Sequence, residues 1–385
     1  MMKTETDKNQ EQWHEWTAVE NEKKKQKSIK ELYDQGYSAY KRADHIYAAE
    51  LFHAASELAR QQSNKEEQCK NLAWEADCFL LTYQYKKALS VMLLAEEIGG
   101  LDPVHRFYNL VHLLETSKNL SLPIAELKKL MEKLEPYKTI REIGGSKSMV
   151  LYWEAKLLGS QGDNHTALLR MQEALACQQT GVPRYYDGAY YRALIDYYRL
   201  TDRMSEARQT MARWKETAKG DFIDEKLNQI LTDGQLSFSE GNLDAAWDTF
   251  QCAYAEERYI GLAGKRIATL IWLVETGAQT GRFFEVRPYL RDLFAFRHSE
   301  SAFLRYSCCY YFFDYYYLMM KAIQRFRLEC QDHPTDFPCD LIVARNRAEQ
   351  WLNRAESYGK ELDSLQNVSW RESKIKKMRT ALLTT

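Results

Sequence analysis

A period of about forty residues organises the apolar positions of this chain. Seven times, a small or aliphatic residue is followed four positions later by Phe, Met or Leu and three positions after that by Ala, Leu or Trp. These anchor triplets begin at Ala48, Ala88, Leu127, Ala167, Ala207, Ala246 and Val286, which lie 40, 39, 40, 40, 39 and 40 residues apart. The spacing inside a triplet is that of one face of an α-helix. A repeat of this length is typical of a solenoid in which each helix pair buries its apolar face only against its neighbours.

The first predicted helix pair shows how two helices would fit together. It begins near Ser28, turns around residues 42–44 and continues into a second helix. Small residues at Gly36 and Ala48 would let the two helices approach closely, because neither carries a side chain that would hold them apart. Phe52 would then fill the gap between this pair and the next.

This order of small and aromatic residues resembles the tetratricopeptide repeat (TPR) and its longer relatives, over roughly residues 28–300. The turns Glu240–Ala246 and Gln161–Ala167 are similar to the Gly-Asn/Asp loop that precedes the second helix in that family. The chain departs from the family in its longer repeat, since the usual TPR has about 34 residues, and in its displaced prolines at Pro103 and Pro183. The resemblance implies an all-α, right-handed superhelical solenoid of stacked antiparallel helix pairs.

The register divides the chain into three predicted segments. They are a polar leader at 1–27, either flexible or a short helix; seven TPR-like helix pairs at 28–300; and a long aromatic helix, a proline-containing loop and C-terminal capping helices at 301–385. The next comparable triplet begins at Ala348, 62 residues beyond Val286. We attribute this break to an inserted helix at 301–329 and a loop through Pro334 and Pro338.

Composition restricts the classes of partner and the compartment. The chain carries 53 Lys and Arg against 54 Asp and Glu, a balance that argues against direct binding of nucleic acid or a membrane surface by the whole chain. Arg305 and Asp314 interrupt the most apolar stretch, residues 302–320, so we expect no membrane span. Residues 1–10 lack an apolar run, and the eight cysteines form no CxxC pair. A reducing, cytoplasmic location is therefore predicted.

No motif in the sequence predicts catalysis, a cofactor or a metal. Residues 143–148 fail the phosphate-loop pattern, because Ser146 rather than Gly precedes Lys147; a helix start with a Ser cap is expected instead. Cys330, His333 and Cys339 lack a standard zinc spacing and are interpreted as part of a loop whose cysteines point inward. We therefore expect no enzyme, although a pocket at this loop stays open as an alternative.

Tyrosine is abundant, with 25 in the chain and dense clusters at 185–198 and 303–317. Packing between helices explains such clusters, and a peptide-binding groove is the functional alternative. The resemblance implies that certain first-helix positions face the concave side of the solenoid. Carried over to this sequence, these positions give the candidate partner-binding residues Tyr33, Tyr37, Tyr40, Tyr152, Lys156, Arg192, Asp196, Arg199 and Gln235, with Ala73, Asp77, His112, Asn228, Phe238 and Glu275 at equivalent places.

Three cations in this set suggest the chemistry of a partner. Lys156, Arg192 and Arg199 would hold carboxylates of an acidic or carboxy-terminal peptide segment, and Tyr152 would supply an apolar wall. A surface with 28 % charged residues also shows such a trio without a binding role. The predicted function is a noncatalytic protein-interaction scaffold that binds a protein or peptide segment in its concave groove. The alternative is a ligand- or peptide-sensing regulator that changes superhelix shape and acts through a separate effector.

Overall fold

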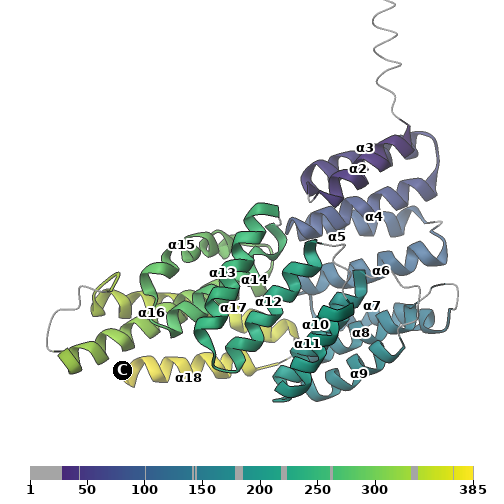
Figure 1. Cartoon of the computed structure of the whole chain (residues 1–385). Helices are drawn as coiled ribbons and strands as arrows, with labels where there is room; N and C mark the ends of the chain where they lie inside the picture. Colours follow the sequence, from purple (N-terminus) through teal and green to yellow (C-terminus); the bar gives the residue numbers. More distant parts are fainter. Residues whose placement is uncertain are drawn as a thin grey trace, which may run out of the picture.

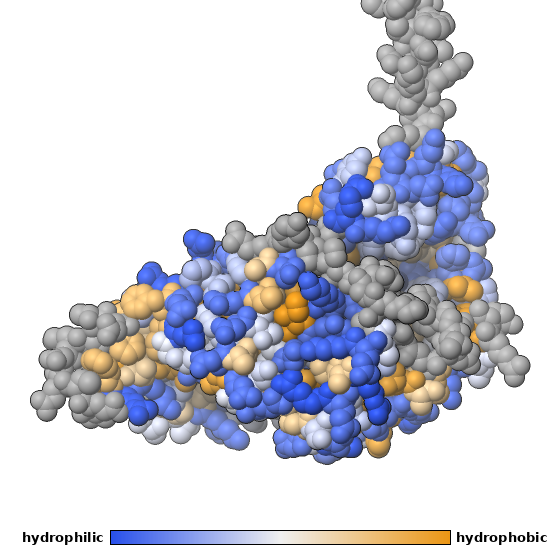
Figure 2. Space-filling model, in the orientation of Figure 1, coloured by the Kyte–Doolittle hydropathy of each residue, from blue (hydrophilic) through white to orange (hydrophobic). Residues whose placement is uncertain are grey.

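A computed structural model describes residues 28–42, 44–99, 101–140, 143, 145–177, 185–217, 223–260, 263–330, 337–366 and 368–384. These residues form helices and turns and contain no strand, so the described chain is all-α, as predicted (Figure 1). The leader at 1–27 lies outside the described residues. The face shown in Figure 2 is mostly hydrophilic, with a small apolar area near its centre.

Seven helix pairs follow one another along the chain. They are α2 (Ile29–Lys41) with α3 (His45–Gln61), α4 (Lys65–Leu81) with α5 (Tyr85–Ile98), α6 (Pro103–Asn119) with α7 (Ile124–Leu134), α8 (Ser146–Ser160) with α9 (Asn164–Ala176), α10 (Tyr185–Leu200) with α11 (Met204–Thr217), α12 (Ile223–Ser239) with α13 (Leu243–Ile260), and α14 (Ala263–Gln279) with α15 (Phe283–Leu293). Short 3-10 helices, η1 (Glu135–Thr139) and η2 (Phe294–His298), extend α7 and α15. The first helices of successive pairs also contact one another; α10, for example, contacts both α8 and α12. The result is a TPR-like solenoid.

The anchor triplets are the core of this stack. Every anchor residue is at most 7 % exposed. The predicted close approach at Gly36 is confirmed, because a Cβ built there would lie 3.0 Å from Cε1 of Phe52. The same device recurs later in the chain, where a Cβ at Gly234 would lie 2.5 Å from Cε1 of Phe250. Only glycine permits this spacing between the two helices of a pair.

One residue with positive φ turns the chain between the two helices of most pairs. Gly162, Gly241 and Gly281 take this place in three pairs, as the loop resemblance implied for the first two. Tyr83 takes it in the second pair, with φ 61°. A bulky side chain is rare in this backbone region and costs free energy to hold there, so the surroundings of Tyr83 must compensate.

The C-terminal helices continue the stack. They are α16 (Ala302–Cys330), α17 (Leu341–Gln366) and α18 (Trp370–Thr384). The long α16 packs along α17, whose triplet Ala348, Leu352 and Ala355 is at most 1 % exposed; α16 and α17 thus form a further pair of the same kind. None of the described helices is long and apolar enough to cross a membrane.

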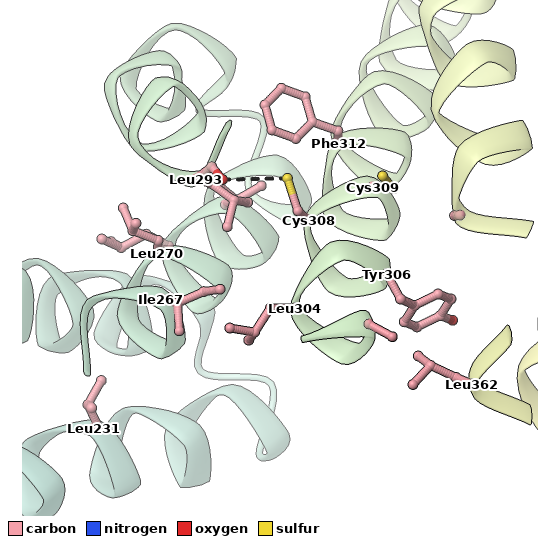
Figure 3. Close-up of a cluster of buried hydrophobic side chains, with 14 of the residues drawn as sticks. Leu231, Ile267, Leu270, Leu293, Leu304, Tyr306, Cys308, Cys309, Phe312 and Leu362 are labelled. Atoms are coloured by element: carbon pink, nitrogen blue, oxygen red, sulfur yellow. Dashed lines mark hydrogen bonds between the residues drawn. The ribbon is translucent and has the colours of Figure 1, made fainter. Parts of the chain in front are cut away.

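One hydrophobic core joins the repeats to the C-terminal helices. Leu270 of α14 and Leu304 of α16 belong to the same buried cluster, shown in Figure 3. In that view the thiol of Cys308 donates a hydrogen bond to the carbonyl oxygen of Leu293 at 3.5 Å. Burial raises the pKa of the Cys308 thiol to about 12, so this cysteine is an inert apolar residue of the core.

The solenoid curls until its seventh pair meets its second. The backbone N–H of Lys86, in the first turn of α5, donates a hydrogen bond to Oε2 of Glu300 at 2.8 Å. The rings of Tyr83 and Phe296 lie 5.7 Å apart. Glu300 therefore caps α5, although it lies 214 residues from Lys86 in the sequence. The N-cap residue of α5 itself, Gln84, makes no side-chain cap bond. A carboxylate at a helix N-terminus is stabilising, and the ring contact compensates the strained Tyr83.

Glycine substitutions test the packing of the pairs. Gly234→Ala should lower the free energy of unfolding by about 1–3 kcal/mol, because the new methyl group overlaps Phe250. Gly188→Ala is the matched control within a first helix: its Cβ would lie 3.4 Å from the nearest atom, Cζ2 of Trp214. There the gain in helix propensity should stabilise by up to about 1 kcal/mol. Urea denaturation of both variants measures the difference, and equal effects would contradict the predicted packing.

Removing the long-range cap tests the curl. Glu300→Ala should destabilise the chain by about 0.5–2 kcal/mol and, combined with Phe296→Ala, should increase the radius of gyration in small-angle X-ray scattering. Glu349→Ala on the exposed side of α17 changes the net charge equally and should leave the radius unchanged. An unchanged radius in the double variant would show that the curl does not depend on this contact.

Candidate partner-binding face

Charged and tyrosine side chains of successive first helices interact in one continuous series. We call this series the inner row: Asp77 on α4; His112, Glu115 and Lys118 on α6; Tyr152 and Lys156 on α8; Arg192, Asp196 and Arg199 on α10; Glu275 on α14; Asp314 on α16; and Lys374 on α18. Most members act electrostatically on a member from the next helix in the row, and Nδ1 of His112 lies 3.9 Å from Oδ1 of Asp77. The helix α12 contributes no member, so Arg199 of α10 acts on Glu275 of α14. The row therefore links side chains of helices that lie far apart in the sequence.

An aromatic cluster begins the row. Tyr33, Tyr37 and Tyr40 place their ring centroids 6.4, 5.3 and 5.2 Å from that of Trp74 on α4. The hydroxyl of Tyr40 donates a hydrogen bond to Oδ2 of Asp77 at 2.6 Å. The structure therefore brings the three predicted tyrosines together around a tryptophan that the sequence analysis missed. The only sequence signal for Trp74 was its place next to Ala73, a predicted inner position.

The middle of the row is cationic and poorly hydrated. Burial, together with the neighbouring charge of Lys156, lowers the pKa of Lys118 to about 8. Burial also lowers the pKa of Lys156, although Asp196 opposes this shift. Both side chains nevertheless keep partial solvent exposure, so they are half-buried and do not belong to the core. Lys118 was missed from sequence, because the family pattern does not mark its position.

Two arginines on α10 complete this cationic section. Nη1 of Arg192 donates a hydrogen bond to Oδ1 of Asn228 on α12 at 3.1 Å. The guanidinium of Arg199 lies 5.9 Å from the ring centroid of Trp272, and its Nη2 lies 3.6 Å from Oδ1 of Asp196. The cationic section, defined as Lys118, Lys156, Arg192 and Arg199, thus contains all three cations predicted from sequence.

Unused hydrogen-bonding capacity lies beside the cationic section. Gln235 is 7 % exposed, and within the described part of the chain its Oε1 has no hydrogen-bond partner. Nε of Arg199 likewise has no hydrogen-bond partner among the described residues. Gln235 shares a face of α12 with Asn228 and with Phe238, whose ring lies 5.2 Å from that of Trp272. A buried polar atom without a partner is costly, and a peptide main chain supplies the N–H and C=O groups that would satisfy both atoms.

The far end of the row is acidic and lined by tyrosine. Burial raises the pKa of Glu275 to about 7 and that of Asp314 to about 6. Tyr311 hydrogen-bonds Glu275. The ammonium nitrogen of Lys374 lies 4.3 Å from the ring centroid of Tyr310, and burial lowers its pKa. We call these two carboxylates and two tyrosines the acidic end.

The sequence expectations for metal and phosphate sites have mixed outcomes. Among the described residues no cluster of His, Cys, Asp and Glu could hold a metal ion. Residues 331–336, with His333, and the side chain of Cys330 lie outside this description. At residues 143–148 a helix does begin, but the predicted Ser cap is wrong. Gly145 occupies the N-cap, and the hydroxyl of Ser146 instead donates to the carbonyl of Tyr137 at 2.6 Å, tying α8 to η1.

Comparisons with known proteins give only distant similarities. No protein-family model matches the chain, and no curated protein matches its sequence. A solved tetratricopeptide repeat protein from Parabacteroides merdae is 14 % identical, with a TM-score of 0.32, over 88 % of this chain and 98 % of its own. The P58(IPK) TPR domain is 9 % identical, with a TM-score of 0.25, over 91 % and 99 %. Since these scores are low, the fold class, an all-α TPR-like solenoid, rests on the helix pairs of this chain.

The raised pKa of Glu275 predicts a pH dependence of stability. The folded state keeps a proton that the unfolded state releases between about pH 4.5 and about pH 7, so the free energy of unfolding should fall as pH rises through this range. Glu275→Gln cannot titrate and should lose less stability between these pH values than the parent protein. Urea denaturation at both pH values tests this, and parallel losses would contradict the desolvated environment of Glu275.

Proposed function

We propose that this protein is a noncatalytic interaction scaffold that binds an extended protein or peptide segment along the inner row. The observation that carries the proposal is the cationic section with its unmet hydrogen bonds at Gln235 and Arg199. It holds four cations from three helices, and burial lowers the pKa of Lys118 and Lys156. Repulsion and desolvation of this kind work against folding, so a binding role accounts for their retention.

Carboxylates are the chemistry that this section would take. An acidic side chain or a terminal carboxylate forms charge-assisted hydrogen bonds with Lys and Arg, and these strengthen where water is excluded. The unpartnered Oε1 of Gln235 would accept a main-chain N–H of the same segment. Tyr33 and Tyr37 would offer rigid aromatic contacts at the other end of the row, at little cost in side-chain entropy.

The curl supports a second candidate, a regulator that responds to a bound segment by changing its superhelix shape. Its basis is the junction at which Glu300 caps α5 and Phe296 meets Tyr83. A segment that binds the open array better than the closed one would shift the chain toward the open form. A larger radius of gyration in the presence of a bound segment would favour this candidate, and an unchanged radius would favour the rigid scaffold.

The cytoplasm is the compartment that we propose for either function. All seven cysteines whose side chains the structure describes are unpaired thiols, in keeping with a reducing environment.

Affinity capture from native cell extract tests the scaffold proposal. The test variant is Lys156→Gln/Arg192→Gln/Arg199→Gln, which removes three inner charges while keeping polar side chains. The control is Lys128→Gln/Lys129→Gln/Arg345→Gln, which removes three exposed charges from α7 and α17. The inner variant should lose a captured partner by about 100-fold in affinity, as two lost charge-assisted bonds would imply.

Equal loss in both variants would mean that net charge alone drives capture. Retention of the partner by the inner variant would contradict the proposed site, provided that its helical circular dichroism matches that of the parent protein.

A further inference from the structure

We propose that the acidic end of the inner row is a subsite for a lysine or arginine side chain of the bound segment, and that Lys374 is its internal occupant in the unbound protein. This inference rests on the proposed function. It adds that the segment must carry a positive charge as well as the negative charge that the cationic section binds. Glu275 and Asp314 reach the subsite from two different helices, and Tyr310 and Tyr311 come from a face of α16 beside Asp314. Carboxylates beside an aromatic face are what an ammonium or guanidinium group requires.

Lys374 shows how a cation fits this subsite. Its ammonium nitrogen lies over the ring of Tyr310, 4.3 Å from the centroid, and it interacts electrostatically with both carboxylates. Among the described residues, however, no ion pair within 4.0 Å joins Lys374 to Glu275 or Asp314. Two further charges act on Glu275: the positive charge of Arg199 on α10 and the negative charge of Asp314 on α16. The carboxylates therefore retain capacity for a more direct cation.

The side chain of Lys374 can rotate out of the subsite while α18 stays in place. Nη1 of Arg371 and Oδ1 of Asp363 form an ion pair at 3.1 Å, with side chains 4 % and 5 % exposed. The backbone N–H of Glu372 donates to the same carboxylate at 2.8 Å. Ile375, 2 % exposed, completes the anchor of α18 on α17. A long lysine side chain on a fixed helix has rotamers that point to solvent, so a partner cation would displace only this side chain.

Gln235 lies on α12 between residues that contact the two charged sections. It is buried on α12, between Asn228, which bonds Arg192 of the cationic section, and Phe238, which meets Trp272 one turn before Glu275. Its unpartnered Oε1 would accept a main-chain N–H of a segment that runs from one section to the other. The expected segment thus carries an acidic residue and, at a fixed spacing from it, a basic residue.

Selection of displayed random decapeptides on the full-length protein tests the subsite. The targets are the parent protein, Lys374→Ala, and Glu275→Gln/Asp314→Asn in the Lys374→Ala background. Lys376→Ala is the matched control, since Lys376 is an exposed lysine of the same helix. Peptides selected on Lys374→Ala should be enriched in Lys or Arg at one spacing from an acidic residue, about tenfold more than on the parent or on Lys376→Ala. The carboxylate variant should abolish that enrichment.

A second measurement uses the best peptide selected on Lys374→Ala. Replacing its basic residue by norleucine should weaken binding to Lys374→Ala about tenfold or more and should not change binding to the carboxylate variant. If the double carboxylate variant loses its helical circular dichroism, Asp314→Asn alone replaces it, with a smaller effect in the same direction.

The outcomes separate this inference from the proposed function. Acidic enrichment without a basic position overturns the subsite and leaves the scaffold proposal standing. Basic enrichment that survives in the carboxylate variant also overturns the subsite. Equal basic enrichment on the parent protein and on Lys374→Ala overturns the role of Lys374. Absence of acidic enrichment on every target overturns the proposed cationic site itself.

Discussion

Close packing within each helix pair is the constraint on which the rest of this structure depends. A pair has too little apolar surface to form a core alone, so its anchors must be covered by the next pair. Glycine on the first helix lets the second approach, as Gly234 does for Phe250. The same contact occurs at Gly36 and Gly277, while the anchors that recur about every forty residues set the stack. The polar side chains of the first helices are then left on one common side.

The inner row follows from this packing and from the curl. Side chains from α6, α8 and α10 are half-buried where these helices pack together. Burial then lowers the pKa of the lysines Lys118 and Lys156 and raises that of Glu275. Each shift means that the charged form is less stable here than in water. These groups therefore reduce the stability of the fold at this place, and the binding role that would explain them is our proposal.

The periodic part of the fold could be predicted from sequence, and the non-local part could not. The anchors, the Gly36 contact and the turns at Gly162 and Gly241 are local or repeat every forty residues, so a single sequence reveals them. The cap of α5 by Glu300 joins residues 214 apart, and no local pattern encodes it. The pairing of α16 with α17 was hidden because α16 is longer than the helices of the repeats, which displaces the eighth triplet.

The candidate site shows the same division. The family pattern identified Lys156, Arg192 and Arg199, which the structure places in one series, and Tyr33 and Tyr37, which pack against Trp74. Their role in binding is our proposal. Trp74, Lys118 and Lys374 were missed from that set. Whether a lysine is half-buried depends on the neighbouring helices rather than on its own segment. Sequence periodicity predicts which face of a helix a residue occupies but not how exposed its side chain is to solvent.

Site-specific photo-crosslinking is the most direct test of binding along the inner side. Benzoylphenylalanine would replace either Tyr37 on α2, which is 37 % exposed, or Tyr47 on α3, which is 45 % exposed. The two positions belong to the two helices of one pair and differ little in exposure, so they form a matched comparison. Irradiation in native cell extract should give a partner adduct from position 37 and none from position 47. An adduct from position 47 alone would place the partner on the outer helices and contradict the account.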